Sequence, residues 1–408
     1  MKIKIIDLKY IFIIVGLTLL QERFFFQINR NLVLIISLIG LIYTIFNMKK
    51  ILKTKFEFKK MIFWLIIIEL YGIFISYIKY GQTMFTGIIG THYIFIYGLY
   101  FFFVNLLLKK NINSNIEKFK KIFIFTGIVF SILLIIQSLI YPRIFLKLNY
   151  GIRNGLRIIG CNIIQFAFAV SVCDAINNFK LKKIIPIFIM GYELFFINQA
   201  RNVILIFCVI ILFLIYKKNS EKNKLFFITV LLCIPIIIII LNQVGIVDFI
   251  NQIIFELKNV EGTSGVRVNE LRFYYEKLKE SKFLGIGILG SEFPLMNKIY
   301  GNYKGYYMED IGISAFIFKT GILGLLWTIA WILKLFSIIK KCTGWGKTLA
   351  IFVALKTVFS IFFSISFIFD IKDGLIYFVM ILAILDVECR KIEEKEIIKN
   401  ENSSTWSY

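Results

Sequence analysis

The chain has very little histidine and proline, and its cysteines show no paired spacing. A single histidine, His92, argues against a histidine-rich metal centre. The six cysteines include no CxxC motif, which argues against a zinc site or a disulfide framework and favours small packing residues. Only four prolines interrupt the apolar stretches, so long helices can form. We therefore expect no metal and no cofactor.

Acidic residues are also scarce. The chain has 25 of them and 48 lysines and arginines, which gives a net charge of +23. Such a charge can indicate nucleic-acid binding. Here it is spread through short segments between apolar stretches, without a basic, aromatic-rich domain, so we expect no nucleic-acid partner. With 59% hydrophobic residues and a mean hydropathy of +0.80, the composition excludes an ordinary soluble domain.

Apolar runs long enough to cross a bilayer recur along the chain. We predict an all-α integral membrane protein, a bundle of about twelve transmembrane helices with one large extracytoplasmic loop that carries short helices. Lys2 and Lys4 precede an apolar run without a cleavage site, so we expect a retained first helix. The predicted spans are residues 8–21, 31–47, 61–79, 87–108, 119–141, 158–177, 184–199, 202–216, 225–247, 310–339, 348–369 and 374–389.

Lysines gather in every second segment between the predicted helices. By the positive-inside rule these segments, and both termini with them, face the cytoplasm. We predict one polytopic membrane domain over residues 1–391 and a disordered cytoplasmic tail over residues 392–408. The five segments carry 6, 5, 3, 4 and 3 lysines and no arginine, at residues 47–60, 109–121, 177–183, 217–224 and 340–347.

The large extracytoplasmic loop covers about residues 248–307 and is the region long enough to fold over the bundle. Surface helices are predicted at residues 248–258 and 267–281. The second is indicated by an apolar stripe with charges on the opposite face, formed by Leu271, Tyr274, Tyr275 and Leu278.

Eight of the nine arginines lie in or beside segments predicted to face outward, against the orientation bias, and only Arg390 lies inside. A guanidinium fork suits phosphate, so an anionic ligand would explain this placement. We predict that arginines from three separated segments converge over one cavity. They are Arg157 with Arg153 before it, Arg201, and Arg267 with Arg272.

The alternative for each arginine is a nearby acid or a lipid head group, which long cationic side chains reach by snorkelling. We expect this interfacial role for Arg23, Arg30 and Arg143.

Two neighbouring acids, Glu309 and Asp310, stand where the large loop re-enters the membrane. Either could act as a general base toward a sugar hydroxyl, and the alternative is a helix N-terminal charge favoured by the helix dipole. Glu69 and Glu193 lie inside predicted spans, where acids are costly and usually paired. Glu193 could orient an arginine, and a proton-coupled role is the rival interpretation.

Three further polar residues are candidate supporting groups. Lys319 follows Asp310 on the same predicted helix, and Asn162 follows Arg157. His92 could be a base, although a lone histidine at this place is more often interfacial. The Gly285–Gly290 segment matches GxGxxG but lies in an outer loop without the βαβ context of a nucleotide site. We expect its glycines to let the loop turn tightly against the bundle.

With these residues in place, the chain resembles the O-antigen ligase/polymerase family (the Wzy and WaaL type) over residues 153–326. The similarity rests on four short motifs whose order and spacing match. They are Arg157-Ile-Ile-Gly160 with Asn162, the hairpin arginine Arg201, Ser264-Gly-Val-Arg267 with Phe283-Leu-Gly285-Ile-Gly287, and Gly321-Ile-Leu-Gly324.

The resemblance implies an enzyme of the bacterial cytoplasmic membrane. Members of this family transfer glycans from an undecaprenyl pyrophosphate carrier on the outer face, without metal or nucleotide, and their arginines hold the pyrophosphate. Ligases of the family carry a His-Asn pair eleven residues before the first closing glycine. Here that position is Asp310, with no histidine nearby, which favours a polymerase.

We therefore expect a glycosyltransferase that joins undecaprenyl-pyrophosphate-linked oligosaccharide repeats into O-antigen, capsule or exopolysaccharide. The expected partners are this lipid-linked oligosaccharide, the lipid bilayer, a flippase and a chain-length regulator. Two alternatives stay open. One is a ligase that moves glycan to a lipid or protein acceptor, and the other is a flippase or transporter that uses Glu69 and Glu193.

Overall fold

The computed structural model is predominantly helical. It describes residues 5–21, 31–109, 111–141, 143, 146, 150–152, 156–158, 161–198, 201–219, 255, 262–361 and 374–404. Within these residues the secondary structure consists of helices and one two-stranded hairpin, which confirms the helical fold class. The predicted span 225–247 lies outside the described residues, as do nearly all of the predicted helix 248–258, Arg23 and Arg30.

The first half of the chain forms helices separated by short turns. They are α1 (Ile5–Gln21), α2 (Asn31–Phe46), α3 (Met48–Lys53), α4 (Lys59–Tyr80), α5 (Met84–Gly90), the 3-10 helix η1 (His92–Tyr97), α6 (Gly98–Leu107) and α7 (Ile112–Ile140). Strands β1 (Tyr150–Ile152) and β2 (Leu156–Ile158) follow, then α8 (Asn162–Asn177), η2 (Leu181–Lys183), α9 (Ile184–Tyr192), the π-helix η3 (Glu193–Asn198) and α10 (Arg201–Asn219).

The second half begins with the helix of the large loop. Its elements are α13 (Gly262–Glu280), α14 (Met296–Ile299), η4 (Asn302–Lys304), η5 (Met308–Ile311), α15 (Ile313–Thr320), α16 (Ile322–Lys341), α17 (Gly344–Phe359) and α18 (Leu375–Ser404). Helix α18 continues to Ser404, beyond residue 391, where the predicted membrane domain ends. Glutamate, lysine and isoleucine dominate this stretch and tolerate a helix well.

Three of the described helices are long and apolar enough to cross a membrane: Lys59–Tyr80, Ile112–Ile140 and Ile322–Lys341. A fourth span is added if α5 and the helix over His92–Leu107, bent by 59°, count as one broken span. Shorter apolar helices cover Lys9–Leu19, Leu34–Phe46 and Asn162–Asn177. These helices are consistent with a membrane protein.

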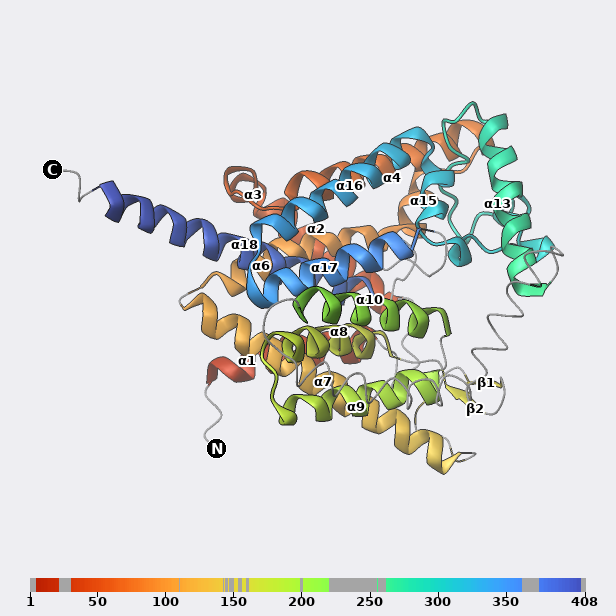
Figure 1. The fold of residues 1–408 in the computed structure, drawn as a ribbon. Coiled ribbons are helices and arrows are strands. Elements are labelled where there is room, and N and C mark those ends of the chain that lie inside the picture. Colours follow the sequence, from red (N-terminus) through yellow and green to blue (C-terminus); the bar gives the residue numbers. More distant parts are fainter. Residues whose placement is uncertain are drawn as a thin grey trace.

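The elements divide between two ends of the molecule (Figure 1). The first turn of α1, α3 and the last turn of α18 lie at one end, which we call the terminal end. Strands β1 and β2 and helix α13 lie at the opposite end, which we call the hairpin end. The long helices run between the two ends, and their packed side chains form the main core.

Buried ion pairs fix the terminal end. The Asp386 carboxylate is fully buried and accepts hydrogen bonds from the Tyr100 hydroxyl, the Glu57 N–H and the Arg390 Nε–H. Glu57 pairs in turn with Lys334 and Lys341, at 2.5 Å each. Arg390, the one arginine predicted to face inside, is thus a structural partner of Asp386. Such charges are tolerated here because each has a hydrogen-bonded counter-charge.

A second, smaller core lies at the hairpin end beneath α13. Tyr274 and Leu278 of α13 are buried in it, together with Tyr300, Met308 and Phe318. The predicted apolar stripe is wrong in one member, because Tyr275 is 45% exposed and stacks with Lys279 instead. Residues 267–281 are helical as predicted, and α13 begins earlier, at Gly262.

The predicted single helix over residues 310–339 is wrong, because the chain breaks into η5, α15 and α16. The second break falls at Gly321, whose φ of +67° is unfavourable for other residues. There the Ile322 N–H donates to the Phe283 carbonyl at 3.0 Å, so the loop after α13 inserts between α15 and α16. The tertiary contact replaces the helical hydrogen bond.

The glycine-rich segment after α13 is held against the bundle, as predicted. Gly287 has φ +103°, its N–H donates to the Lys319 carbonyl at 2.9 Å, and the next N–H, of Ile288, donates to the Gly72 carbonyl. Gln82 brackets the segment by donating to the Ile288 carbonyl and accepting from the Gly290 N–H. A Cβ at Gly287 would lie 2.4 Å from the Ser76 Oγ, so only glycine fits.

Gly287→Ala is therefore expected to lower stability by about 1–3 kcal/mol, because it adds both strain at positive φ and overpacking. Gly305→Ala is the matched control, since Gly305 also has a positive φ of +78° but has no atom within 4 Å of the added Cβ. Thermal unfolding in detergent measures both variants. Equal losses would show that the packing of this segment against α4 does not matter.

Candidate functional site

One group of predicted residues lies on neighbouring elements at the hairpin end. Arg157 stands on β2, where it pairs with Gly151 of β1 in an antiparallel hairpin. Strand β2 packs against α7 and η3, and η3 packs against the first turns of α10, which begins at Arg201. The structure thus brings the backbones of Arg157, Glu193 and Arg201 onto adjoining elements. Arg157 lies on a strand, directly before the predicted span 158–177.

The predicted span 184–199 ends in a π-helix, η3, that starts at Glu193. Glu193 and Asn198 are buried. The wider turn of a π-helix redirects side chains and is frequent at functional sites. The location of Glu193 beside β2 fits its predicted role of orienting an arginine, which stays a prediction because the side chains of Arg157 and Arg201, and all of Arg153, lie outside the described residues.

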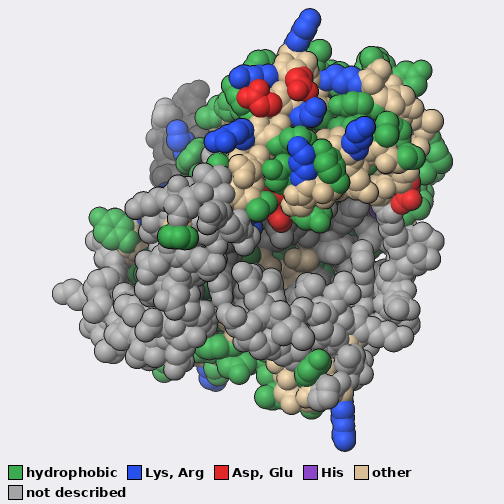
Figure 2. Space-filling model, turned by 90° about the vertical axis from the view of Figure 1, so that its right-hand side faces the viewer, with side chains coloured by type: hydrophobic (Ala, Val, Ile, Leu, Met, Phe, Trp, Pro, Cys, Tyr) green, Lys and Arg blue, Asp and Glu red, His purple; other side chains and the backbone are tan. Residues whose placement is uncertain are grey.

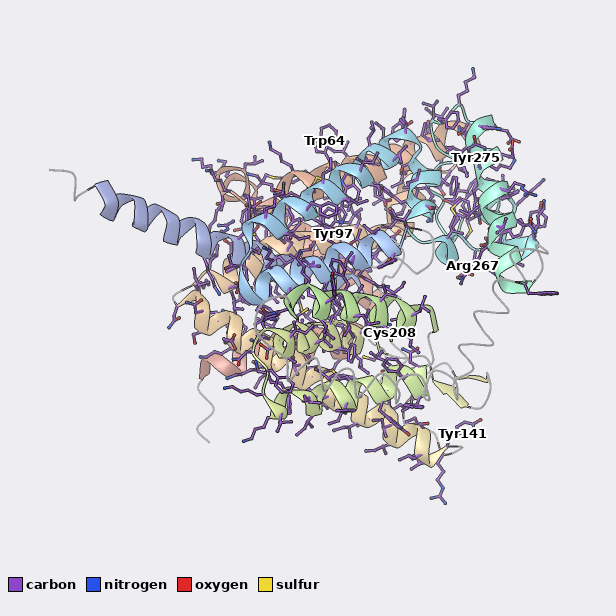
Figure 3. All side chains as sticks on the ribbon, in the orientation of Figure 1. Trp64, Tyr97, Tyr141, Cys208, Arg267 and Tyr275 are labelled. Atoms are coloured by element: carbon purple, nitrogen blue, oxygen red, sulfur yellow. The ribbon has the colours of Figure 1, made fainter. Side chains whose placement is uncertain are left out.

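A second group surrounds α13. Arg267 lies near the start of this helix (Figure 3), and its Nε is buried without a hydrogen-bond partner among the described residues. One turn on, Glu270 is only 1% exposed. Its Oε1 accepts the Tyr307 N–H at 2.8 Å, and its Oε2 is buried without a described hydrogen-bond partner. Helix α13 therefore presents a buried donor and a buried acceptor that are both available to a ligand.

Burial, and after it the negative charge of nearby Asp310, raises the pKa of Glu270 from its ordinary 4.5 to about 7. The Tyr307 N–H and the Arg267 guanidinium act in the opposite direction. Asp310 reaches this position because η5 packs against α13. A carboxyl group with this pKa can gain and lose a proton near neutral pH, as a general base must.

Glu270 was not predicted as a site residue. The sequence analysis placed the charges of this helix on the face opposite the apolar stripe, and only the apolar members of the stripe inside. A signal was present, since Glu270 lies four residues before Tyr274 and eight before Leu278, on the same helical face. A carboxylate on an apolar stripe is costly and therefore points to function.

Arg272 does not join this group. It is exposed, and at 100° per residue it lies about 140° around the helix from Arg267. Arg272 therefore lies apart from the buried pair on this helix, and its place in the arginine cluster stays a prediction. Figure 2, which views the hairpin end, shows charged side chains gathered over this outer part of the molecule. They include the exposed ion pairs of Lys277 with Glu280 and of Lys279 with Glu276.

The other predicted residues have separate places. Lys319 is half-buried on α15, which packs against α13, and its Nζ lies 5.8 Å from the Tyr300 ring centroid. His92 is buried in the break after α5, where its Nδ1 lies 2.6 Å from the Ile89 carbonyl. Asn162 is half-buried at the start of α8. The side chain of Glu309 lies outside the described residues.

A cavity lies between the hairpin-end parts of α8, α10, α17 and α18. Its polar lining residues are Gln165, Lys356, Thr357 and Ser360. Gln165 is three residues beyond Asn162 on α8, and Phe207 of the wall is six residues beyond Arg201 on α10. The cavity therefore lies deeper in the helical bundle than the first residues of α8 and α10, which follow Arg157 and begin at Arg201.

No family model matches the chain, and no curated protein matches it.

Proposed function

We propose that the protein is a polysaccharide polymerase that joins undecaprenyl-pyrophosphate-linked oligosaccharide repeats on the outer face of the bacterial cytoplasmic membrane. The observation that carries the proposal is the pair on α13, in which the buried Arg267 Nε and the buried Glu270 Oε2 stand one turn apart without hydrogen-bond partners in the described part of the chain. This pair suits a reaction that needs a cation for phosphate and a base for a hydroxyl.

The proposed membrane arrangement is a bundle of about twelve spans with the hairpin end outward. Its support is that the lysine-rich segments 47–60 and 340–347 belong to the terminal end, where Glu57 pairs with Lys334 and Lys341. The first turn of α1 and the last turn of α18 lie at that same end, as an even number of spans requires (Figure 1). Arg267 and Glu270 then face the side on which the lipid-linked repeats are presented.

In the proposed reaction, a sugar hydroxyl of an incoming repeat attacks the anomeric carbon of the growing chain. The new glycosidic bond forms as the bond to undecaprenyl pyrophosphate breaks, with inversion at that carbon. The hydroxyl proton passes to the Glu270 carboxylate, and the bond electrons leave with the pyrophosphate. Fixed guanidiniums stabilise the charge that develops on this leaving group, so the chemistry of these residues is complete without a further ion.

Glu270 takes the base role in this scheme, which the sequence had assigned to Asp310 or Glu309. Its Oε2 is buried and available, and its pKa of about 7 leaves much of it ionised in neutral solution. Asp310 is half-buried and acts through its charge, which keeps the pKa of Glu270 high. In this proposal Arg267 contributes to the pyrophosphate site, together with Arg157 on β2 and Arg201 at the start of α10.

Deleting the gene in its own host tests the function against the two alternatives. A polymerase predicts that long surface glycan disappears while glycan of a single repeat remains attached. A ligase predicts the loss of attached glycan of every length. A flippase predicts that lipid-linked repeats accumulate on the inner leaflet, which protection from an added external glycosidase would reveal. Gel separation of surface glycan and extraction of the lipid-linked repeats measure the outcome.

A further inference from the structure

Two cysteines that are 47 residues apart in sequence lie in contact at the terminal end. Cys342 directly follows the last residue of α16, and Cys389 lies on α18. Their Sγ atoms are 3.1 Å apart, and both side chains are buried free thiols. A disulfide bond is roughly 2.05 Å long, so the two sulfurs need to approach each other by only about 1 Å to form one.

Ion pairs beside the two cysteines hold their backbones together. Lys341, directly before Cys342, pairs with Glu57 at 2.5 Å. Asp386, one turn before Cys389, accepts the Glu57 N–H at 2.7 Å. The end of α16 and the middle of α18 are therefore joined through Glu57, without any contribution from the sulfurs. Because the two thiols are already oriented, a reaction between them avoids most of the entropy cost of bringing two groups together.

A metal ion does not account for this contact. Two sulfur ligands fall short of the four that a structural zinc site uses. The residues that the structure describes also contain no group of three or more His, Cys, Asp or Glu side chains that could hold an ion. A thiol is a weak hydrogen-bond donor, so hydrogen bonding gives little reason for the two sulfurs to meet. The chemistry that suits the pair is that of two thiols and their disulfide.

The position of the pair decides which reagent can reach it. Cys342 is buried, but the next two residues, Thr343 and Gly344, are exposed and form the turn between α16 and α17. A small molecule can reach the sulfurs when this turn opens locally, because turns open at low cost in free energy. A protein disulfide would need the whole segment to unfold. The oxidant that fits is therefore a small peroxide.

We propose that Cys342 and Cys389 are a redox-active pair, which hydrogen peroxide converts into a disulfide that joins the end of α16 to α18. The peroxide first oxidises one thiolate to a sulfenic acid and is reduced to water. The second thiol then attacks that sulfur, so that the S–S bond forms, the S–O bond breaks, and the hydroxyl leaves with the thiol proton as a second water molecule. Exchange with a small dithiol restores both thiols.

This inference is independent of the polymerase assignment. With the hairpin end outward, the terminal end faces the cytoplasm, where thiols are kept reduced and the disulfides that do form are mostly transient and redox-sensing. The pair would then be reduced in normal growth and oxidised under peroxide stress. The bond would close a loop of 47 residues, which restricts the unfolded chain and should raise the unfolding temperature by several degrees.

Peptide mapping of the full chain in detergent tests the inference. The folded protein is treated with hydrogen peroxide, denatured, alkylated with N-ethylmaleimide and digested without reduction. We expect mass spectrometry to find a peptide in which Cys342 is linked to Cys389, and dithiothreitol to remove it. Thermal unfolding of the same samples should show the higher unfolding temperature only before dithiothreitol is added.

Cys342→Ser should abolish both the linked peptide and the rise in unfolding temperature. Cys208→Ser is the matched control, because Cys208 is a half-buried cysteine on α10, and it should keep both. If Cys342→Ser does not fold, the peptide map of the wild type and Cys389→Ser decide the matter. Two alkylated thiols after peroxide treatment, or a disulfide from either cysteine to a different one, would overturn the inference and leave the pair a packing contact.

Discussion

Arg267→Ala is expected to reduce polymerisation of lipid-linked repeats by on the order of 10²–10³-fold, the usual cost of removing one donor to a developing anion. The reason for this expected loss is the environment of the Arg267 side chain. The Arg267 Nε is buried without a hydrogen-bond partner in the described residues, so a bound pyrophosphate would supply the bond that the fold does not. Purified protein in detergent with synthetic lipid-linked repeats, followed by separation of the products by length, measures the rate.

Arg272→Ala is the matched control for this experiment. Arg272 stands on the same helix but is exposed, so its loss removes a charge from α13 without touching the buried pair. We expect it to change the rate by less than threefold, within the small effects typical of surface substitutions. Arg267→Lys should recover only part of the activity, because an ammonium cannot make the two-pronged contact of a guanidinium. Normal chain lengths from Arg267→Ala would rule out the arginine mechanism.

The helices that were predicted best are those whose secondary structure is determined by their local sequence. Apolar runs over Lys59–Tyr80 and Ile112–Ile140 form long helices in the structure. The Gly72 carbonyl accepts a bond from the Ile288 N–H without breaking the first of them. Where the prediction was wrong, another segment intervenes. At Gly321 the Phe283 carbonyl replaces a helical partner, and at Glu193 the helix widens beside β2. Such breaks depend on contacts between residues far apart in sequence.

The candidate site residues show the same difference between local sequence properties and long-range contacts. Arg267 could be selected from its placement and from the motif around it, because orientation bias and residue type are sequence properties. The burial of Glu270 is indicated in the sequence only by its position on the apolar face of the helix. The return of the chain at Tyr307 and the packing of η5 on α13, which complete this burial, are tertiary contacts. Arg272 lies on a different face of α13 from Arg267, because position on a helix face, and not proximity in sequence, decides which side chains lie together.

Glu270→Gln is expected to lower the polymerisation rate by about 10²–10⁴-fold, the range for a lost general base. The amide keeps the shape of the side chain and can still accept the Tyr307 N–H, so the fold should persist. Glu280→Gln is the matched control on the same helix, because Glu280 is exposed and pairs with Lys277 at the surface. The same length-resolved assay measures both variants.

The pH dependence separates a base from a structural carboxylate. A base works ionised, so the wild-type rate should rise with pH through a midpoint near 7, where burial places the pKa of Glu270. Asp310→Asn removes a negative neighbour and should move this midpoint to lower pH. The free energy of unfolding should change in the opposite direction and fall as the pH rises. Because the folded pKa lies above the ordinary 4.5, ionisation destabilises the fold as pH rises from about 4.5 through 7.

Glu270→Gln should therefore unfold at a temperature that changes less between pH 5 and pH 8 than that of the wild type, while losing the rate. A variant that lost activity and stability together at every pH would indicate that Glu270 only supports the Tyr307 turn. A wild-type rate that was flat across pH 5 to 8 would contradict the assignment directly, because a group with a pKa of about 7 must change its protonation state within that window.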